Sequence, residues 1–355
     1  MRIQVIMYLL CSRAAPGYGK VEYYMQKKGI ILSGMRPTGA LHLGNYLGAL
    51  ENWVKLQDEY QCYYFVADWH ALTTGYEDTS EYKGNITNLL IDWLSAGLDP
   101  EKSVLFIQSS IKEHAELHLL FSMNVPLSWL FRCPTYKDQL NQLKEKNIAT
   151  YGFLGYPCLQ AADILVYKAG FVPVGEDQVP HVEVTREIAR RFNFLYNCEV
   201  FPEPQPLLTK AKVLPGLDGR KMSKSYNNTI ALSDSPDEVH QKVMTMITDP
   251  ARIHKTDPGH PEVCSVFAYH KLFSEEEASD IEQSCKNGAI GCVACKKKLS
   301  ASVVKMMSPI YERRQEWLKR PDDVRDIVKA GDAKARKAAA ETMAQVRKAM
   351  KIDWE

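Results

Sequence analysis

The chain has 355 residues, of which 45% are hydrophobic and 25% are charged, and its formal net charge is +1. This ordinary globular usage excludes a mainly disordered, collagenous or integral-membrane protein, and the length predicts two domains. The charge is unevenly distributed, because residues 296–355 carry sixteen Lys or Arg and nine Asp or Glu. We therefore expect a polyanionic partner at this segment, with a solvated helical surface as the alternative.

The segment before Gly29 shows no clear periodicity and contains a turn-like run from Ala15 to Gly19. We interpret it either as an upstream extension, with Met25 as the better initiator methionine, or as a strand or arm that packs on the folded domain. The apolar run from Ile3 to Leu10 is too short and too poorly flanked for a signal peptide. No stretch reaches the ~20 apolar residues that a membrane span needs. With an odd number of cysteines as well, we expect a cytoplasmic protein with reduced thiols and no membrane partner.

From residue 29 onward, apolar strand-like runs alternate with helical stretches. Continuous apolar strands separated by helices of this length are typical of βαβ units. We therefore predict an α/β fold with a Rossmann-like parallel sheet, whose functional loops follow the carboxyl ends of the strands. The expected strands are 29–33, 62–67, 103–108 and 172–174, and the expected helices are 44–60, 80–96 and 178–192.

Two further segments depart from this alternation. Residues 112–156 have a helical pattern and are predicted to form an insertion. The strand-like runs stop near Ser233, and the remainder is predicted to be all-helical. The domains expected are an extension at 1–28, a Rossmann-type domain at 29–232 and a helical domain at 233–355.

A glycine-flanked loop, Ser33 to Asn45, separates the first strand from the first helix. Gly34, Gly39 and Gly44 allow the backbone to approach a ligand closely. The helix that begins near Gly44 directs its positive end at this loop, so a nucleotide phosphate is the natural occupant, with His42 as an added donor. A simple turn is the alternative for such a loop, and neither the G-x-G-x-x-G nor the Walker pattern is present.

A second motif, Gly219-Arg-Lys-Met-Ser-Lys-Ser225, places two lysines three positions apart among small and polar residues. A loop that carries Lys221 and Lys224 can close over a polyphosphate and neutralise the charge of a leaving pyrophosphate. For a lone pair of lysines, an exposed basic loop is the simpler interpretation.

Together, His-x-Gly-Asn at His42 and the distant Lys-Met-Ser-Lys-Ser at Lys221 resemble the paired signatures of the class I aminoacyl-tRNA synthetases. These enzymes activate an amino acid on ATP and transfer it to tRNA. The second motif matches at all five positions, whereas Asn45 stands where a second histidine is commoner. The resemblance implies ATP with Mg²⁺ as ligands and catalytic roles for His42, Lys221 and Lys224. The implied ATP-binding residues are Ser33, Gly34, Arg36, His42, Gly44, Asn45, Lys146, Lys221, Met222, Ser223, Lys224 and Ser225.

The segments 156–165 and 172–178 look like the amino-acid pocket of bacterial tryptophanyl-tRNA synthetases, a likeness that runs from Gly29 to the C-terminus. Asp163 in an apolar pocket is costly to bury without a donor. An indole N–H supplies that donor, and such a site penalises ligands that lack it. Without the resemblance, Asp163 would be interpreted as a salt-bridge partner on a helix and His70 as a satisfied strand-end histidine. The implied tryptophan-binding residues are Leu32, His70, Tyr156, Asp163, Val172, Val174 and Gln178.

Four cysteines late in the chain follow the pattern C-x20-C-x6-C-x2-C. One C-x-x-C with two further cysteines can bind Zn²⁺ or an iron–sulfur cluster, and four unliganded thiols are the remaining alternative. The segment 290–297 resembles that of a subset of bacterial tryptophanyl-tRNA synthetases with a [4Fe–4S] cluster in the anticodon-binding domain. The resemblance implies that the metal ligands are Cys264, Cys285, Cys292 and Cys295. Cys62 and Cys158 are predicted to be small core residues.

The sequence therefore predicts a tryptophan–tRNA ligase whose substrates are ATP, L-tryptophan and tRNA(Trp). We expect a homodimer with the insertion at its interface and no DNA partner, as the resemblance implies. Tyrosyl-tRNA synthetases share the architecture, but Ala161-Ala-Asp-Ile-Leu165 and Gly175-Glu-Asp-Gln178 favour tryptophan. The rivals are a small-molecule adenylyltransferase of the same superfamily and a catalytically silent paralogue that binds RNA or senses iron. The intact His42 and lysine motif argue against the silent paralogue.

Overall fold

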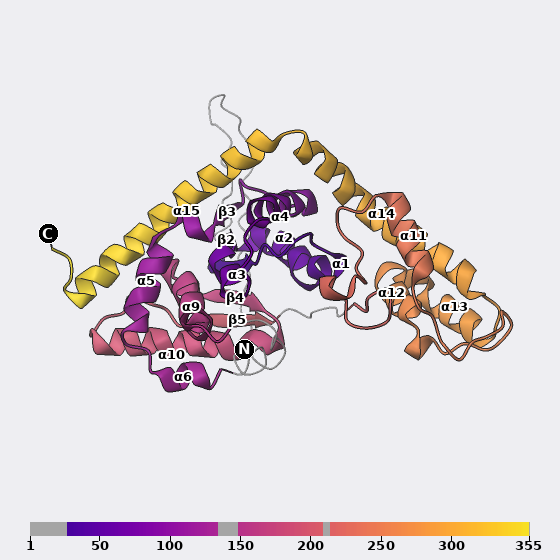
Figure 1. Cartoon of the computed structure of the whole chain (residues 1–355), viewed down its shortest axis with the longest axis horizontal. Helices are drawn as coiled ribbons and strands as arrows, with labels where there is room; N and C mark the ends of the chain where they lie inside the picture. Colours follow the sequence, from indigo (N-terminus) through magenta and orange to yellow (C-terminus); the bar gives the residue numbers. More distant parts are fainter. Residues whose placement is uncertain (1–26, 134–147, 209–213, 355) are drawn as a thin grey trace, which may run out of the picture.

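A computed structural model describes residues 27–133, 148–208 and 214–354, apart from the side chain of Ser225 (Figure 1). Its centre is a five-stranded sheet in the order β3-β2-β1-β4-β5, and every neighbouring pair is parallel. The strands are β1 (Ile30–Met35), β2 (Gln61–Val66), β3 (Ser103–Ile107), β4 (Phe171–Val174) and β5 (Gln205–Leu208). The predicted α/β fold with a parallel sheet is confirmed.

The central strands are apolar on both faces because helices cover both sides of the sheet. Successive side chains of a strand point to opposite faces, so Ile31 packs in one hydrophobic core and Leu32 in the other. On the Ile31 side, Tyr64 of β2 stacks on Trp53, with ring centroids 4.6 Å apart. On the Leu32 side, Phe65 stacks on Phe106 of the neighbouring strand. Two cores thus hold the strand ends in fixed positions.

The chain up to residue 195 supplies most of the helices that surround the sheet. They are α1 (Leu43–Asn45), the π-helical turn η1 (Tyr46–Leu50), α2 (Glu51–Glu59), α3 (Asp68–Gly75), α4 (Tyr82–Ala96), α9 (Tyr156–Val166) and α10 (Val179–Leu195). The predicted helices 44–60, 80–96 and 178–192 are therefore present. The described parts of the expected insertion are also helical, with α5 (Glu113–Ser122), α6 (Leu127–Phe131) and α8 (Tyr151–Leu154).

Sequence reasoning missed two elements. Strand β5 begins with a polar residue and contains Pro206, a residue that is confined to sheet edges, so it lacks the apolar run of a central strand. Helix α3 mixes apolar and polar residues without a clear face. It nevertheless positions His70 directly after β2.

The C-terminal region is helical, as predicted. It consists of α11 (Pro236–Thr245), α12 (Ser265–Phe273), α13 (Glu275–Lys286), α14 (Cys292–Leu318) and α15 (Pro321–Met350), with the short turn η5 (Pro261–Val263). Figure 1 shows α14 and α15 as two long arms that meet at an angle above the sheet. Within the described ranges, no helix has the length and apolarity to cross a membrane.

Helix α15 returns to the sheet and covers its β3 edge. The backbone N–H of Ile107 donates to Asp332 Oδ1 at 3.0 Å, and Arg347 pairs with Glu116 of α5. Gly331 packs directly on the carbonyl oxygen of Leu105. Unpaired backbone groups at an exposed sheet edge promote aggregation, so this helix protects the edge. The division of the chain at residue 233 remains a prediction.

The close approach of α15 to β3 can be tested with Gly331→Ala. A Cβ at this position would overlap the backbone of Leu105, so we expect a loss of about 1–3 kcal/mol in the free energy of unfolding. Gly84 of α4 is the matched control, because a Cβ there meets no atom within 4 Å. Gly84→Ala should stabilise the protein by up to about 1 kcal/mol. Urea unfolding of both variants measures the difference, and a stabilised Gly331→Ala variant would contradict the packing.

Candidate functional site

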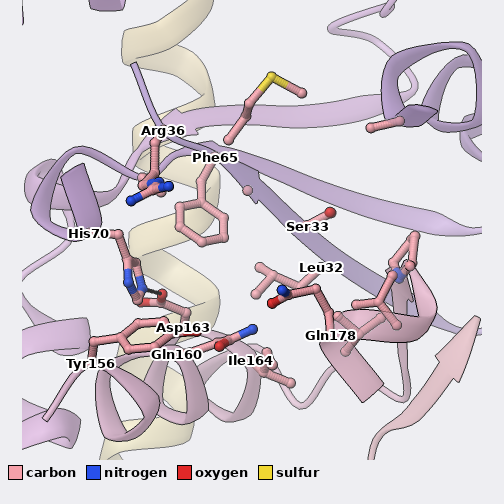
Figure 2. A pocket seen from close by; sticks show the side chains of 18 of the residues that line it. Leu32, Ser33, Arg36, Phe65, His70, Tyr156, Gln160, Asp163, Ile164 and Gln178 are labelled. Carbon is pink, nitrogen blue, oxygen red and sulfur yellow. Dashed lines mark hydrogen bonds and ion pairs between the residues drawn. The ribbon is translucent and has the colours of Figure 1, made fainter. Parts of the chain in front are cut away.

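A cavity of about 410 Å³ opens at the carboxyl ends of β1 and β4, over helix α9 (Figure 2). Parallel α/β sheets bind ligands at this edge, as the sequence predicted. Apolar side chains form most of the wall, among them Leu32, Phe65 and Phe153. The seven residues expected to bind an amino acid all line this one cavity: Leu32, His70, Tyr156, Asp163, Val172, Val174 and Gln178.

Helix α9 forms one wall of the cavity. It follows Gly155, and Pro157 stands in its first turn, where a missing N–H costs nothing. Side chains three to four positions apart share a helix face, so Tyr156, Gln160 and Asp163 are turned together toward the cavity. The other side of the helix packs in the core through residues such as Leu165.

Asp163 lies at the base of the cavity with only 1% of its surface exposed. Its Oδ2 accepts from His70 Nε2 at 2.7 Å, and its Oδ1 accepts from Gln108 Nε2 at 2.8 Å and from His114 Nδ1 at 2.6 Å. Burial raises the pKa of this carboxyl, but the charge and hydrogen bonds of His70 and His114 outweigh burial and hold the pKa below its usual value. Asp163 is therefore ionised at neutral pH.

The Asp163 carboxylate retains capacity for a ligand. An ionised carboxylate has about four acceptor sites, and the donors named above occupy three of them. In an apolar cavity the remaining site favours a ligand that brings an N–H donor. A ligand that brings one N–H donor to the base of an otherwise apolar cavity therefore suits this carboxylate.

Tyr156 is oriented by a neighbour behind the cavity. Its hydroxyl forms a hydrogen bond with His181 Nε2 at 3.0 Å, and burial lowers the pKa of His181. A neutral imidazole accepts the phenolic proton, which orients the Tyr156 hydroxyl at the cavity wall. On the facing wall, Gln178 Nε2 donates to Asp177 Oδ2 at 2.9 Å, so its carbonyl oxygen is available to a ligand.

The residues expected on the nucleotide side divide into two groups. Ser33, Gly34 and Arg36 line the cavity at the end of β1. His42, Gly44, Asn45, Lys221, Met222, Ser223 and Lys224 are described but do not line it. Lys146 lies outside the described residues, and so does the side chain of Ser225.

His42 and Asn45 cap the helix that follows the glycine loop. The Asn45 N–H donates to His42 Nδ1 at 3.3 Å, and the His42 N–H donates to Asn45 Oδ1 at 3.1 Å. Burial, aided by the charge of Lys224, lowers the pKa of His42 to about 4. The ring is neutral at physiological pH, and because Nδ1 accepts, Nε2 carries the proton. Asn45 therefore has a structural role in the motif, which is to cap the helix together with His42.

The second motif lies against the first. Lys224 Nζ donates to the carbonyl of Thr38 at 3.0 Å, within the glycine-flanked loop. Backbone hydrogen bonds join the flanking segments, from the N–H of Leu43 to Ile230 and from the N–H of Leu232 to Leu41. Two signatures that are far apart in the chain are thus neighbours in the fold.

Within the second motif the side chains are placed differently. Met222 is buried beside Gly44, whereas Lys221 is exposed. The N–H of Ser223 donates to Asn228 Oδ1 at 2.8 Å, which fixes the backbone between the two lysines. Both lysines are therefore exposed, and Lys224 also contacts the first motif's loop through Thr38.

The four late cysteines share one neighbourhood. Arg252 Nη1 lies 3.7 Å from Cys285 Sγ and 3.9 Å from Cys292 Sγ. Burial, together with the charges of the other three thiols, raises the pKa of Cys295 to about 12. Among the described residues, however, no group of three or more His, Cys, Asp or Glu is placed to hold a metal ion. The predicted ligand role of these cysteines is therefore unsupported by their arrangement here.

The two cysteines predicted to be core residues, Cys62 and Cys158, are each 1% exposed. Burial also raises the pKa of both thiols. Their predicted role as small core residues is confirmed.

The polar residues of the site that were not predicted include Gln108, His114 and Gln160. Gln108 ends the predicted strand 103–108, so the rule that ligands meet the carboxyl ends of strands could have found it. Gln160 stands four positions after Tyr156 and three before Asp163, a spacing that places it on the same helix face. His114 carries no local signal, because only the tertiary fold brings it to Asp163.

Comparisons with known proteins agree with this geometry. The family of class I tRNA synthetases for W and Y matches residues 25–308. The chain is 56% identical over 325 residues to a tryptophan–tRNA ligase of Thermotoga maritima, which covers 91% of this chain and 99% of that protein. It is 47% identical over 393 residues to the tryptophan–tRNA ligase of Aquifex aeolicus, with 91% of this chain and 99% of that protein covered.

Among solved structures, the fold is similar to the tryptophanyl-tRNA synthetase of Campylobacter jejuni complexed with ADP and tryptophan. The TM-score is 0.82 at 35% identity, over 90% of this chain and 99% of that chain. A tyrosyl-tRNA synthetase of Archaeoglobus fulgidus, complexed with L-tyrosine, is similar in fold alone, with a TM-score of 0.62 at 19% identity.

The low pKa of His42 predicts how stability depends on pH. The pKa is about 4 in the folded protein and near 6.5 in the unfolded chain, so the unfolded state binds more protons between these values. Stability that depends on neutral His42 is present above pH 6.5 and is lost as the pH falls toward 4. His42→Asn keeps an N-cap residue without this titration. We expect the melting temperature of the wild type minus that of His42→Asn to decrease from pH 7 to pH 5. A difference that does not change with pH would contradict the lowered pKa of His42.

Proposed function

The chain belongs to the tryptophanyl-tRNA synthetases of class I, and from this premise we propose that its cavity at the sheet edge binds L-tryptophan for activation by ATP. Its function is that of a tryptophan–tRNA ligase. The observation that carries the proposal is the Asp163 carboxylate, which is ionised, buried and still able to accept one hydrogen bond at the base of an apolar cavity. The indole N–H of tryptophan supplies the donor that this site needs.

The remaining cavity residues suit the other parts of tryptophan. Leu32, Val172 and Val174 are apolar and pack against the ring. Tyr156 and Gln178 present oxygen atoms to the α-ammonium group. A ligand whose ring lacks a donor would leave Asp163 with an unused acceptor in a dry environment, and that loss is the basis of selectivity.

ATP occupies the adjoining space between the two motifs. Ser33, Gly34 and Arg36 connect this space to the tryptophan cavity. Neutral His42 donates through Nε2, and Lys224, held beside the same loop, neutralises phosphate charge together with Lys221. We place Gly44, Asn45, Lys146, Met222, Ser223 and Ser225 in the same ATP-binding region.

In the first step, the tryptophan carboxylate attacks the α-phosphorus of ATP, the bond to the β-phosphate oxygen breaks and pyrophosphate leaves. The carboxylate is already ionised at neutral pH, so no general base is needed. Positioning and charge neutralisation supply the catalysis. Mg²⁺ that accompanies ATP adds positive charge and is held chiefly by phosphate oxygens. Metal binding through phosphate oxygens fits the side chains nearby. The carboxylate of Asp92, which interacts with Lys224, is already paired with Arg314 and so is not expected to be a metal ligand. The tRNA ribose then accepts the tryptophanyl group.

We propose a homodimer whose interface includes the insertion. Several of its large apolar side chains are exposed, and clusters of this kind mark association surfaces. These are Leu119, Met123, Leu127, Phe131 and Tyr151, with exposures from 47% to 70%. A twofold arrangement would bury the same face of both subunits.

For tRNA, we propose that the helical C-terminal region binds the anticodon. The first turns of α14 carry Lys296, Lys297 and Lys298 beside the cysteines. Lys298 pairs with Glu277, while Lys297 is exposed. Basic surfaces attract the phosphate backbone, and unstacked anticodon bases are read on such platforms. We also propose a cytoplasmic location, since the free thiols fit a reducing compartment.

We further propose that Cys264, Cys285, Cys292 and Cys295 hold a [4Fe–4S] cluster, with Zn²⁺ as the alternative. The supporting observations are the sequence pattern of the four cysteines and the position of Arg252, whose Nη1 lies 3.7 Å from Cys285 Sγ and 3.9 Å from Cys292 Sγ. The ligand sulfurs of a [4Fe–4S] cluster lie farther apart than those around a single Zn²⁺. Among the described residues no group is close enough to hold a single ion, and this finding counts against Zn²⁺ more than against a cluster. When bound, the cluster would supply a rigid centre beside the anticodon surface, and Arg252 would donate toward its thiolate ligands.

The ligase function is tested by tryptophan-dependent exchange of labelled pyrophosphate into ATP, run beside tyrosine. Wild type should exchange with tryptophan only, and absence of exchange with any amino acid would support the silent paralogue. Asp163→Asn should lower kcat/KM for tryptophan by about 100-fold, the loss expected when a hydrogen bond to a charged group is removed. Gln345→Ala on α15 is the control and should leave exchange unchanged. Circular dichroism shows whether Asp163→Asn is folded, and a folded variant with wild-type exchange would contradict the role of Asp163.

The cluster is tested with Cys292→Ser. Anaerobically purified wild type should contain iron and sulfide and absorb broadly in the violet region, and the variant should lose both signals. The cysteines are far along the chain from the cavity residues and beside the proposed anticodon surface. Their loss should therefore decrease tRNA aminoacylation more than pyrophosphate exchange. Cys198→Ser is the control, since this free thiol is not one of the four late cysteines and its Sγ lies 3.7 Å from Asn193 Oδ1. Wild type without iron, or an equal loss of both activities, would contradict the proposal.

A further inference from the structure

A buried ion pair joins helix α14 of the C-terminal region to helix α4. Asn88 and Asp92 are four positions apart, so they share one face of α4. Arg314 of α14 donates through Nε to Asp92 Oδ1 at 2.8 Å and through Nη2 to Asn88 Oδ1 at 3.1 Å. Asp92 is 1% exposed and Arg314 is 8% exposed. Both charges are therefore removed from water where the two helices meet.

The second carboxylate oxygen of Asp92 contacts the glycine-flanked loop. Asp92 Oδ2 accepts from the backbone N–H of Leu41 at 3.3 Å. The carbonyl of Leu41 accepts from the N–H of Leu232 at 2.8 Å, on the segment that follows the lysine motif. The backbone directly before His42 is therefore held on one side by a side chain of α4 and on the other by the segment after the second motif.

Stability alone does not account for this carboxylate. A buried ion pair is often no more stabilising than apolar side chains of the same volume, because both charges lose their water. Burial raises the pKa of Asp92, and Arg314, the Leu41 N–H and Lys224 act against that shift. What the carboxylate provides, and an apolar side chain would not, is an acceptor for the buried N–H of the loop. Its contribution is therefore to the position of the loop.

We infer that Asp92 is a positioning residue for ATP, and that Arg314 holds its carboxylate in the orientation that supports the loop before His42. This inference rests on the proposed ATP site. Neither side chain lines the cavity at the sheet edge, so both act through the backbone at Leu41 and not by contact with a substrate. A residue of the helical C-terminal region thereby contributes to the activation of the amino acid.

The first test is Asp92→Asn, which preserves the volume of the side chain. An amide offers one oxygen where the carboxylate offers two, so either Arg314 or the Leu41 N–H then faces an NH2 group. The dissociation constant of ATP with Mg²⁺, measured by calorimetry, should increase at least about fivefold, as expected for one lost hydrogen bond. The dissociation constant of tryptophan should stay within about twofold, because the cavity residues are untouched.

Hydrogen–deuterium exchange reports on the loop itself. Peptides that contain Leu41 should exchange about tenfold faster in Asp92→Asn than in wild type, because their N–H loses a charged acceptor. Peptides from β4 should exchange at the same rate in both proteins. This measurement needs neither substrate nor activity.

A second pair of variants tests the role of Arg314. Arg314→Met should weaken ATP binding in the same way as Asp92→Asn, and Arg314→Lys, which keeps the charge without the planar fork, should recover part of the loss. Arg313→Met is the matched control. Arg313 is the neighbouring residue on α14 and also donates to α4, but to the backbone carbonyl of Ser95 at 2.6 Å. Its loss should change the dissociation constant of ATP by less than about twofold.

Three outcomes would overturn the inference. They are ATP binding that does not depend on Asp92, an equal loss of affinity for ATP and tryptophan in a folded Asp92→Asn variant, and a loop that exchanges at the wild-type rate. Circular dichroism shows which variants fold, and Arg314→Lys keeps the test decisive if Arg314→Met does not. Pyrophosphate exchange by wild type tests the ligase function separately, so failure of that function and failure of the inference give different results.

Discussion

The buried charge of Asp163 is the constraint on which the site depends. A carboxylate at 1% exposure is stable only if donors replace its water, and these donors come from three separate places: His70 after β2, Gln108 after β3 and His114 on α5. The strand ends and the insertion must therefore meet at one point before the cavity can form. Because removal of any donor leaves a buried charge underpaired, the base of the cavity has little freedom to move.

The residues proposed to bind the nucleotide are held by fewer and weaker hydrogen bonds than Asp163. His42 and Asn45 close their helix turn through two hydrogen bonds, and Lys224 reaches the same loop through one contact with a backbone carbonyl. The Lys224 side chain is exposed overall, and partial burial of its ammonium group lowers its pKa. Phosphate oxygens are stronger acceptors than this carbonyl. In the proposed ATP site, this contact would therefore compete only weakly with the phosphates for Lys224.

Patterns local in sequence were predictable, and contacts that depend on the tertiary fold were not. The central strands were identified from unbroken apolar runs. Asp163 was identified from the family resemblance, since the residues alone made it a salt-bridge partner on a helix. Strand β5 was missed because Pro206 makes it an edge strand with a weak pattern. The donor role of His114 was missed because that residue lies 49 positions from Asp163 and only folding joins them. The packing of Gly331 on β3 could not be predicted from the sequence either. A glycine within a helical segment indicates only a weak helix former, not a close contact with a strand.

The long C-terminal helices connect the two halves of the chain more closely than their order along it suggests. Arg314 of α14 donates to buried Asp92 at 2.8 Å, and the other oxygen of Asp92 accepts from the N–H of Leu41, the residue before His42. Removal of either charge would leave its partner buried and unpaired. The helix that begins at the cysteines is thus anchored directly beneath the nucleotide loop. Helix α14 thus carries the exposed Lys297 and Lys298 near its start and, further along, the Arg314 that is bonded to Asp92. If the proposed anticodon surface and ATP site are correct, this one helix connects them.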